Sequence, residues 1–161
     1  MGWTPEVTVA AVVMRDARFL MVEERIAGEL VLNQPAGHLE DGETLEAAVI
    51  REAREETAWR FVPHSLVGTY LWRNPTNGRS FLRFAFCGSV EDFRPRQALD
   101  KGIVRAVWLS HEELLAEAFR LRSPLVLRCI DDFLGGKRQT LDSVACLNLE
   151  TALAASSVVN L

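Results

Sequence analysis

Runs of alternating and β-branched apolar residues in the first part of the chain predict strands. Residues 7–14 and 18–23 are rich in Val, Met and other apolar residues, which favour the pleated, half-buried environment of a sheet. Asp16 and Ala17 lie between the two runs and predict a turn. A shorter apolar run over residues 30–33 predicts a third strand.

The second half of the chain repeats the strand pattern over residues 65–73, 80–90 and 105–109. An Asn-Gly pair at 77–78 lies between the first two of these runs, and Asn-Gly is a strong signal for a hairpin turn. The pattern therefore predicts a hairpin around residues 74–78, followed by one more strand.

Three segments predict helices because each begins at a capping residue or a proline: residues 44–57, 110–119 and 123–134. Thr44 can cap the first of these helices. Ser110 is followed by Glu113 at the third helical position, which is the spacing of a capping box. Pro124 suits the first turn of the third helix, and Gly135 marks its end.

The order of these elements predicts a single α/β domain (α+β) over residues 1–161. Strands and helices interleave, which suits a sheet with helices on both faces. Residues 140–161 show an ambiguous pattern, so the structure of the tail from residue 135 onward is not predicted.

Composition narrows the class of protein and its location. The net charge of −4 argues against a nucleic-acid polymer or an anionic membrane as partner, because proteins that bind them are usually basic. No apolar run is long enough to cross a bilayer, and no signal-peptide pattern begins the sequence. Cys87, Cys129 and Cys146 lack metal-ligand spacing, and we expect them to be reduced. We therefore expect a cytoplasmic protein.

Glu52, Glu55 and Glu56 carry the main chemical signal of the chain. At positions i, i+3 and i+4 they would share one face of the first predicted helix. Like charges at this spacing repel one another, and a divalent cation would neutralise them. Carboxylates suit Mg²⁺ or Mn²⁺, which keep waters and accept phosphate oxygens as further ligands. A solvated acidic face is the alternative, but the segment before the helix argues against it.

A loop with helix breakers at Pro35, Gly37 and Gly42 precedes this helix. Gly37 would let the backbone approach a metal or ligand closely, and its carbonyl oxygen could itself be a metal ligand. A glycine loop therefore leads into a helix that carries a carboxylate cluster.

Loop and helix together resemble the Nudix box, the signature of hydrolases that cleave phosphoanhydride bonds of nucleoside diphosphates linked to other groups. The matching positions are Gly37, Glu43, Arg51, Glu52, Glu55 and Glu56. A match of this length is far more specific than a short glycine motif. The family usually has Gly where this chain has Ala58, and a left-handed conformation there would strain an alanine.

The resemblance extends beyond the box, over roughly residues 5–135, to the bacterial NudJ-type phosphatases within that family. The stretches that carry it are residues 7–10, 22–24, 33–40, 81–84 and 121–126. The resemblance implies the Nudix α/β/α sandwich with a mixed sheet, and Mg²⁺ or Mn²⁺ as cofactor.

The resemblance also implies roles for the charged residues of the box. Glu52 and Glu56 are expected to be metal ligands, and Glu55 is either a further ligand or the base that orients the attacking water. All three are therefore catalytic candidates. Glu43 and Arg51 are expected to form an ion pair that ties the loop to the helix and supports the site.

Four further residues are candidates for substrate binding: Arg83, His38, Glu40 and Trp72. Arg83 interrupts an apolar strand and needs an anionic partner, either a substrate phosphate or a protein carboxylate. His38 could reach a phosphate or only hydrogen-bond the loop, and Glu40 could join the metal ligands or stay solvated. Trp72 could stack on a base or belong to the core. Asp100, before the last strand, is expected to be an ordinary surface residue.

These observations predict a Mg²⁺-dependent hydrolase of phosphoanhydride bonds in nucleoside tri- and diphosphates. The NudJ resemblance adds hydroxymethylpyrimidine pyrophosphate and thiamine pyrophosphate as substrates. The alternatives are an ADP-ribose or dinucleotide pyrophosphatase and a non-catalytic module that binds a nucleotide. The intact glutamates favour an enzyme, because a binding module does not need carboxylates that repel one another. The expected partner is a small nucleoside or pyrimidine polyphosphate, and the chain is expected to be a monomer or a homodimer.

Overall fold

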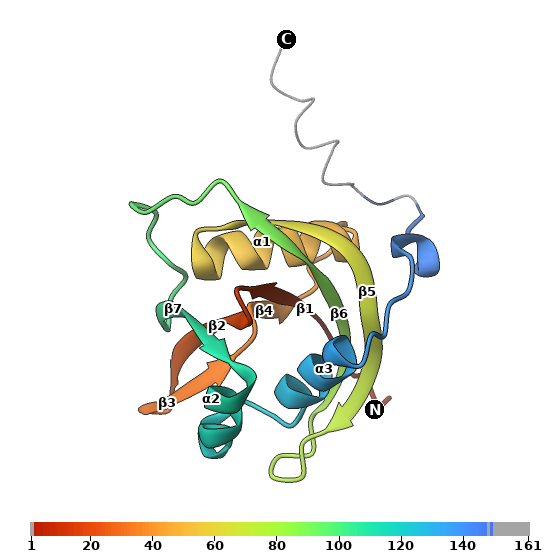
Figure 1. Ribbon diagram of the computed structural model, residues 1–161. Coiled ribbons are helices and arrows are strands. Elements are labelled where there is room, and N and C mark those ends of the chain that lie inside the picture. Colours follow the sequence, from red (N-terminus) through yellow and green to blue (C-terminus); the bar gives the residue numbers. More distant parts are fainter. Residues whose placement is uncertain (1, 148, 150–161) are drawn as a thin grey trace.

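The strands and helices of the computed structural model largely follow the apolar pattern of the chain (Figure 1). The strands are β1 (Glu6–Arg15), β2 (Arg18–Ile26), β3 (Glu29–Asn33), β4 (Ala36–His38), β5 (Arg60–Arg73), β6 (Ser80–Glu91) and β7 (Ile103–Ser110). The helices are α1 (Leu45–Thr57), α2 (His111–Ala116) and α3 (Leu125–Leu134), with short 3₁₀ turns η1 (Ala118–Arg120) and η2 (Leu141–Ser143). The structure describes residues 2–147 and 149, so most of the ambiguous tail lies outside the described residues.

The strands form a 7-stranded mixed sheet in the order β3-β2-β1-β6-β5, with β4 beside β1 and β7 beside β2. β1 and β6 are parallel, and the other pairs are antiparallel. β1 pairs with β4 along residues 8–10, but its register with β2 covers only Met14 and Arg15. β1 therefore pairs with β4 near its start and with β2 only at its end.

Helices cover both faces of the sheet (Figure 1). α1 packs on one face, where Val9, Ala11 and Val13 of β1 contribute to the core. Residues of α2 and α3 pack on the other face with Val12. This alternation follows from the strand, in which successive side chains point to opposite faces. The predicted α/β/α sandwich with a mixed sheet is confirmed.

Helix α1 begins and ends where its sequence predicts. Thr44 Oγ1 accepts a hydrogen bond from the backbone N–H of Ala47, at 3.1 Å. At the other end Ala58 adopts the left-handed conformation, with φ 63°. Arg54 Nη1 donates to the Ala58 carbonyl oxygen at 2.9 Å, and this hydrogen bond helps to hold a conformation that is strained for alanine.

Two elements differ in kind from the prediction, and β5 begins at Arg60, earlier than the predicted residue 65. Ala36–His38, expected to be loop, form β4 because residues 8–10 of β1 offer an antiparallel edge. Tertiary pairing overrides the local breakers here. The helix expected to reach Phe119 ends at Ala116, and the chain continues as the tighter turn η1.

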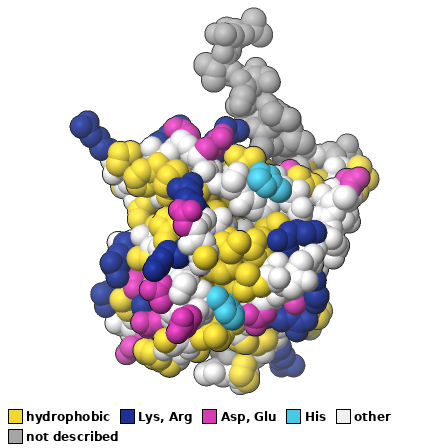
Figure 2. All heavy atoms as spheres, in the orientation of Figure 1, with side chains coloured by type: hydrophobic (Ala, Val, Ile, Leu, Met, Phe, Trp, Pro, Cys, Tyr) yellow, Lys and Arg dark blue, Asp and Glu magenta, His cyan; other side chains and the backbone are white. Residues whose placement is uncertain are grey.

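Charged side chains of both signs are mixed over the face seen in Figure 2, and hydrophobic side chains gather near its centre. Among the described residues, no continuous basic stripe crosses this face. No helix in the described part of the chain is both long and apolar enough to cross a membrane.

Candidate active site

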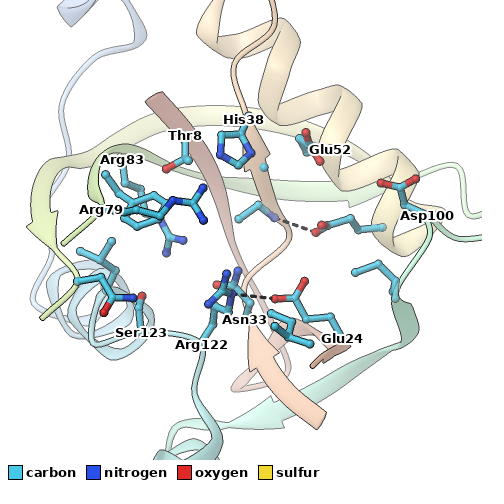
Figure 3. Close-up of a pocket in the computed structure, with 18 of the residues that line it drawn as sticks. Thr8, Glu24, Asn33, His38, Glu52, Arg79, Arg83, Asp100, Arg122 and Ser123 are labelled. Atoms are coloured by element: carbon cyan, nitrogen blue, oxygen red, sulfur yellow. Dashed lines mark hydrogen bonds and ion pairs between the residues drawn. The ribbon is translucent and has the colours of Figure 1, made fainter. Parts of the chain in front are cut away.

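A pocket of about 440 Å³ lies where α1, β4 and the ends of β2 and β3 meet the β5–β6 hairpin (Figure 3). Figure 3 shows Glu52 and Asp100 on one side of it and Arg79 and Arg83 on the other. We call the side with Glu52, Glu56 and Asp100 the acidic wall, and the side with Arg79 and Arg83 the basic wall. The predicted site residues that line this pocket are Gly37, His38, Glu40, Glu52, Glu56, Trp72 and Arg83.

Glu52 and Glu56 bring two buried carboxylates to the acidic wall, and they lie one helical turn apart on α1. The two residues are only 8% and 6% exposed. Glu56 Oε2 accepts a hydrogen bond from the backbone N–H of Ala36 at 2.9 Å, so β4 orients this carboxylate. The contact also explains why the short strand matters for the site.

Gly37 lies directly against the carboxylate of Glu52. A Cβ atom at position 37 would come within 2.0 Å of Glu52 Cδ, far inside van der Waals contact. The glycine is therefore required by close approach to a side chain of the acidic wall.

Burial raises the pKa of both carboxyls on α1. For Glu56 burial is the main cause, the nearby Glu52 and Glu24 add to it, the Ala36 N–H opposes it, and the pKa rises to about 9. For Glu52 burial also raises the pKa, although Arg51 opposes this effect. A cation in the pocket would favour the charged forms of both carboxyls and would therefore lower their pKa values.

Arg51 holds the acidic wall in place from outside the pocket. It makes a bidentate pair with Glu43, from Nε to Oε2 at 3.1 Å and from Nη2 to Oε1 at 2.7 Å. Nη1 also donates to Glu52 Oε1 at 2.8 Å, and Nη2 donates to the His38 carbonyl oxygen at 3.0 Å. The structure thus contains the ion pair predicted between the loop and the helix. Through Arg51 this ion pair is also connected to the carboxylate of Glu52.

Glu55 stands apart from the other two glutamates of the cluster. Its side chain is 43% exposed, lies 3.3 Å from Arg51 Nη1 and does not line the pocket. Among the residues that the structure describes, no three His, Cys, Asp or Glu side chains are arranged to hold a metal ion. The role of Glu55 therefore stays a prediction.

The acidic wall nevertheless fits a divalent cation. Mg²⁺ usually binds one or two carboxylates, keeps several waters and takes substrate phosphate oxygens as its remaining ligands. Glu52 and Glu56 supply two buried carboxylates beside open pocket space. This donor set suits a cation that binds together with its substrate.

Arg83 is the buried cation of the basic wall and is only 6% exposed. Its Nη1 donates to Gln34 Oε1 at 3.2 Å, and no carboxylate of the described residues forms an ion pair with it. Of the two partners considered for Arg83, a protein carboxylate is therefore not present in the described part of the chain.

The remaining predicted substrate-binding residues lie around the rim and side of the pocket. His38 Nε2 lies 2.7 Å from Glu6 Oε2, and Arg79 also donates to this carboxylate. Trp72 is half-buried and stacks on Phe81, with ring centroids 5.8 Å apart. His38 and Trp72 can therefore contact a substrate only with the part of each side chain that faces the pocket.

The pocket also contains residues that sequence reasoning did not assign to it: Thr8, Glu24, Asn33, Asp100, Arg122 and Ser123. Asp100 is exposed, as expected of a surface residue, but it also lines the acidic wall because its backbone N–H donates to the Glu55 carbonyl oxygen at 2.9 Å. Glu40, by contrast, is an exposed rim residue whose carboxylate lies 3.7 Å from Arg51. The only signal for the others was their place in short stretches that resemble NudJ-type phosphatases.

The fold and the acidic wall together define the class of protein. A sandwich of helices around a mixed sheet positions a glycine loop against a helix with buried carboxylates, and the NUDIX domain model matches residues 4–128. The chain belongs to the Nudix family. It is a Nudix phosphoanhydride hydrolase.

Two relatives show which members of the Nudix family this chain resembles. The chain is 42% identical to Phosphatase NudJ of Escherichia coli K12 over 144 residues, which is 89% of this chain and 93% of that protein. A solved NUDIX hydrolase from Nitrosomonas europaea is 47% identical, with a TM-score of 0.88, over 90% of this chain and 99% of that one.

A more distant structure shares the fold alone. It is a bifunctional NMN adenylyltransferase/ADP ribose pyrophosphatase of Francisella tularensis, complexed with AMP and a Mn ion. It is 23% identical, with a TM-score of 0.64, over 84% of this chain and 42% of that one.

Proposed function

We propose that the protein is a Mg²⁺-dependent phosphatase of nucleoside tri- and diphosphates. By its similarity to Phosphatase NudJ, we extend the proposal to hydroxymethylpyrimidine pyrophosphate and thiamine pyrophosphate. The observation that carries the proposal is the pair of buried carboxylates, Glu52 and Glu56, which face a pocket with a buried arginine on its opposite wall. Such a pocket suits a ligand that brings both a cation and phosphate oxygens.

The residues of the acidic wall would divide the work between them. A divalent cation, when bound, supplies charge neutralisation for the phosphates and a lower pKa for the attacking water. Glu52 and Glu56 would hold it, Gly37 gives Glu52 the space to do so and could add its carbonyl oxygen, and the Ala36 N–H orients Glu56. Glu55 would be a further ligand or the base that orients the water. Phosphoryl transfer needs mainly this positioning and charge neutralisation.

Mn²⁺ is the natural substitute for Mg²⁺ in this proposal. Both are hard cations that prefer carboxylate, carbonyl and water ligands. The side chains of the acidic wall, Glu52, Glu56 and Asp100, offer only oxygen ligands. Mn²⁺ can therefore serve as a probe of the same site. We further propose a cytoplasmic monomer or homodimer that acts on small polyphosphates.

An ADP-ribose or dinucleotide pyrophosphatase is the alternative within the same enzyme class, and a nucleotide-binding module without activity is the alternative outside it. Product analysis separates them. The protein is incubated with Mg²⁺ and GTP, ADP-ribose or a pyrimidine diphosphate, and orthophosphate and mononucleotides are measured. The proposal predicts orthophosphate from GTP and from the pyrimidine diphosphate. Mononucleotide from ADP-ribose as the main product would support the pyrophosphatase, and no product from any substrate would support the binding module.

The same assay tests the site through a matched pair of variants on α1. Glu56→Gln replaces a buried carboxyl of the pocket by a group that cannot ionise, and we expect turnover to fall by about 10³-fold because the cation loses a charged ligand. Glu46→Gln makes the same chemical change in the first turn of α1, outside the pocket, and should retain turnover. Equal activity of the two variants would remove Glu56 from the site.

A further inference from the structure

Buried polar atoms without a partner in the protein gather in the pocket. Among the described residues, the buried side-chain atoms that lack a hydrogen-bond partner in the chain are Thr8 Oγ1, Asn33 Oδ1, Arg83 Nε, Arg120 Nη1 and Ser123 Oγ. All of these residues except Arg120 line the pocket. Buried polar atoms are nearly always hydrogen-bonded in folded proteins, so this concentration points to a ligand that supplies the missing partners.

Among the described residues, Arg83 also has no direct ion-pair partner, and the carboxyls of Glu24 and Glu56 act on its charge only from a longer distance. Its contacts are the amide oxygen of Gln34, at 3.2 Å, and the thiol of Cys129. Burial raises the pKa of the Cys129 thiol to about 11, so the thiol stays neutral near pH 7. An arginine does not give up its proton in proteins, and a buried charge without an opposite charge is costly. An anionic ligand would remove this cost.

The other arginines of the pocket differ from Arg83 in this respect. Arg79 donates to both oxygens of Glu6, at 2.6 and 2.7 Å. Arg122 lies 3.3 Å from Glu24, and Figure 3 shows this pair between the two walls. The protein therefore matches the charges of Arg79 and Arg122, and Arg83 is the arginine of the pocket that is left for a ligand.

Several distant segments converge to place the unpartnered atoms. Thr8 and Arg83 are direct neighbours on the parallel strands β1 and β6, so their side chains lie on the same face. The backbone N–H of Arg122 donates to the Leu32 carbonyl oxygen at 2.8 Å, which brings Ser123 next to the end of β3, where Asn33 lies. Figure 3 shows Thr8, Arg83 and Ser123 on the side of the pocket with Arg79, and Asn33 next to the pair of Arg122 and Glu24.

We propose that Thr8, Asn33, Arg83 and Ser123 form a phosphate seat that binds the free terminal phosphoryl group of the substrate. The hydroxyls and the guanidinium donate to phosphate oxygens, and the Asn33 amide oxygen accepts from a protonated one. The seat rests on the proposed function, in which the acidic wall and its cation bind the same polyphosphate. Substrates with a free phosphoryl end fit both walls, whereas ADP-ribose and dinucleotides carry an esterified group at each end and leave the seat unmatched.

Orthophosphate binding tests the seat without any hydrolysis. Wild-type protein in EDTA is titrated with inorganic phosphate and followed by ³¹P NMR or calorimetry. We expect saturable binding that weakens at least about tenfold in Arg83→Gln, because hydrogen bonds to a charged group are lost. Arg60→Gln, a change in an exposed ion pair outside the pocket, should bind as the wild type does. No binding by the wild type would overturn the proposal.

Two smaller variants keep the test valid if Arg83→Gln fails to fold. Thr8→Val and Ser123→Ala each remove one hydroxyl with little change in volume, and each should weaken phosphate binding by about tenfold. Phosphate affinities within twofold of the wild type in all folded variants would overturn the seat.

The seat and the proposed function fail in different measurements. Glu56→Gln should lose turnover and keep orthophosphate binding in EDTA, since the seat does not need the acidic wall. In folded Arg83→Gln, the ratio of kcat/KM for GDP to that for ADP-ribose should fall by about tenfold, while Mn²⁺ binding stays as in the wild type. An unchanged ratio overturns the seat alone, and a wild type that turns over neither substrate overturns the proposed function alone.

Discussion

The acidic and basic walls of the pocket bury opposite charges, and the protein holds them in different ways. On the acidic side, Arg51 lies between 2.7 and 3.7 Å from the carboxylates of Glu40, Glu43, Glu52 and Glu55. On the basic side, Arg83 contacts an amide oxygen and a neutral thiol. The protein thus compensates most charges of the Nudix box itself, whereas Arg83 has no ion-pair partner among the described residues.

Glu56 is the counterpart of Arg83 on the acidic wall. Its carboxylate accepts a hydrogen bond from the Ala36 N–H, forms no ion pair with a residue of the described part of the chain, and has its pKa raised to about 9 by burial. Comparing the two walls therefore separates two kinds of charged residue. Those with a charged partner in the protein support the site, and those without one, Glu56 and Arg83, mark where we propose that a cation and a phosphate bind.

The largest effect is expected from breaking the support of the acidic wall with Arg51→Met. The change would leave the carboxylates of Glu43 and Glu52 without their cation, and breaking such a partly buried network costs about 3 kcal/mol. The free energy of unfolding, measured by urea denaturation, should fall by this amount. Arg60→Met, which breaks an exposed ion pair, should change it by less than about 1 kcal/mol. Similar losses in both variants would contradict the supporting role of Arg51.

Gly37→Ala should damage activity without damaging the fold. The new Cβ would meet the carboxylate of Glu52 at 2.0 Å, and this flexible end can move aside. A catalytic group displaced by about 1 Å can cost about 100-fold in rate. We therefore expect kcat to fall by that factor while the thermal unfolding midpoint changes little. An unchanged kcat would show that the position of the Glu52 carboxylate does not matter.

Asp100→Asn tests whether Asp100 contributes to cation binding by the acidic wall. Asp100 lines the pocket from a loop far from α1 in sequence, and removal of its charge should weaken Mn²⁺ binding about tenfold, as for outer ligands in other metal sites. Electron paramagnetic resonance of free Mn²⁺ measures this affinity. Asp41→Asn, an exposed loop change outside the pocket, serves as control, and equal Mn²⁺ affinities of the two variants would show that Asp100 does not act on the cation.

The smallest effect is expected from Ala58→Gly, at the end of the helix that carries the acidic wall. Relief of the left-handed conformation at φ 63° should stabilise the protein by about 1 kcal/mol, visible in urea denaturation, with unchanged turnover. No gain in stability would contradict the presence of strain at Ala58, because the hydrogen bond from Arg54 goes to the backbone carbonyl oxygen and is kept in the glycine variant.

Short-range features of the fold and site could be predicted well because their causes are local. The cap at Thr44, the left-handed Ala58 and the shared face of Glu52 and Glu56 follow from spacing along one helix. The pairing of Arg51 with Glu43 was implied by the resemblance to the Nudix box, and the structure contains it. The shared helix face did not bring Glu55 into the pocket, because its side chain turns to Arg51 instead.

By itself the sequence determined a sheet between helices, the glycine loop and the helix with its carboxylates, because the apolar period and the residue spacing that predict them are local. The parallel pairing of β1 with β6, which makes the sheet mixed, joins distant segments, and only the family resemblance implied it. Tertiary structure alone decided that Ala36–His38 pair with β1 and that Asp100 joins the acidic wall. It also decided that Thr8, Asn33, Arg83 and Ser123 line the same pocket. The physical reason is that such contacts join segments far apart in the chain, so no local pattern records which polar atoms stay without a partner.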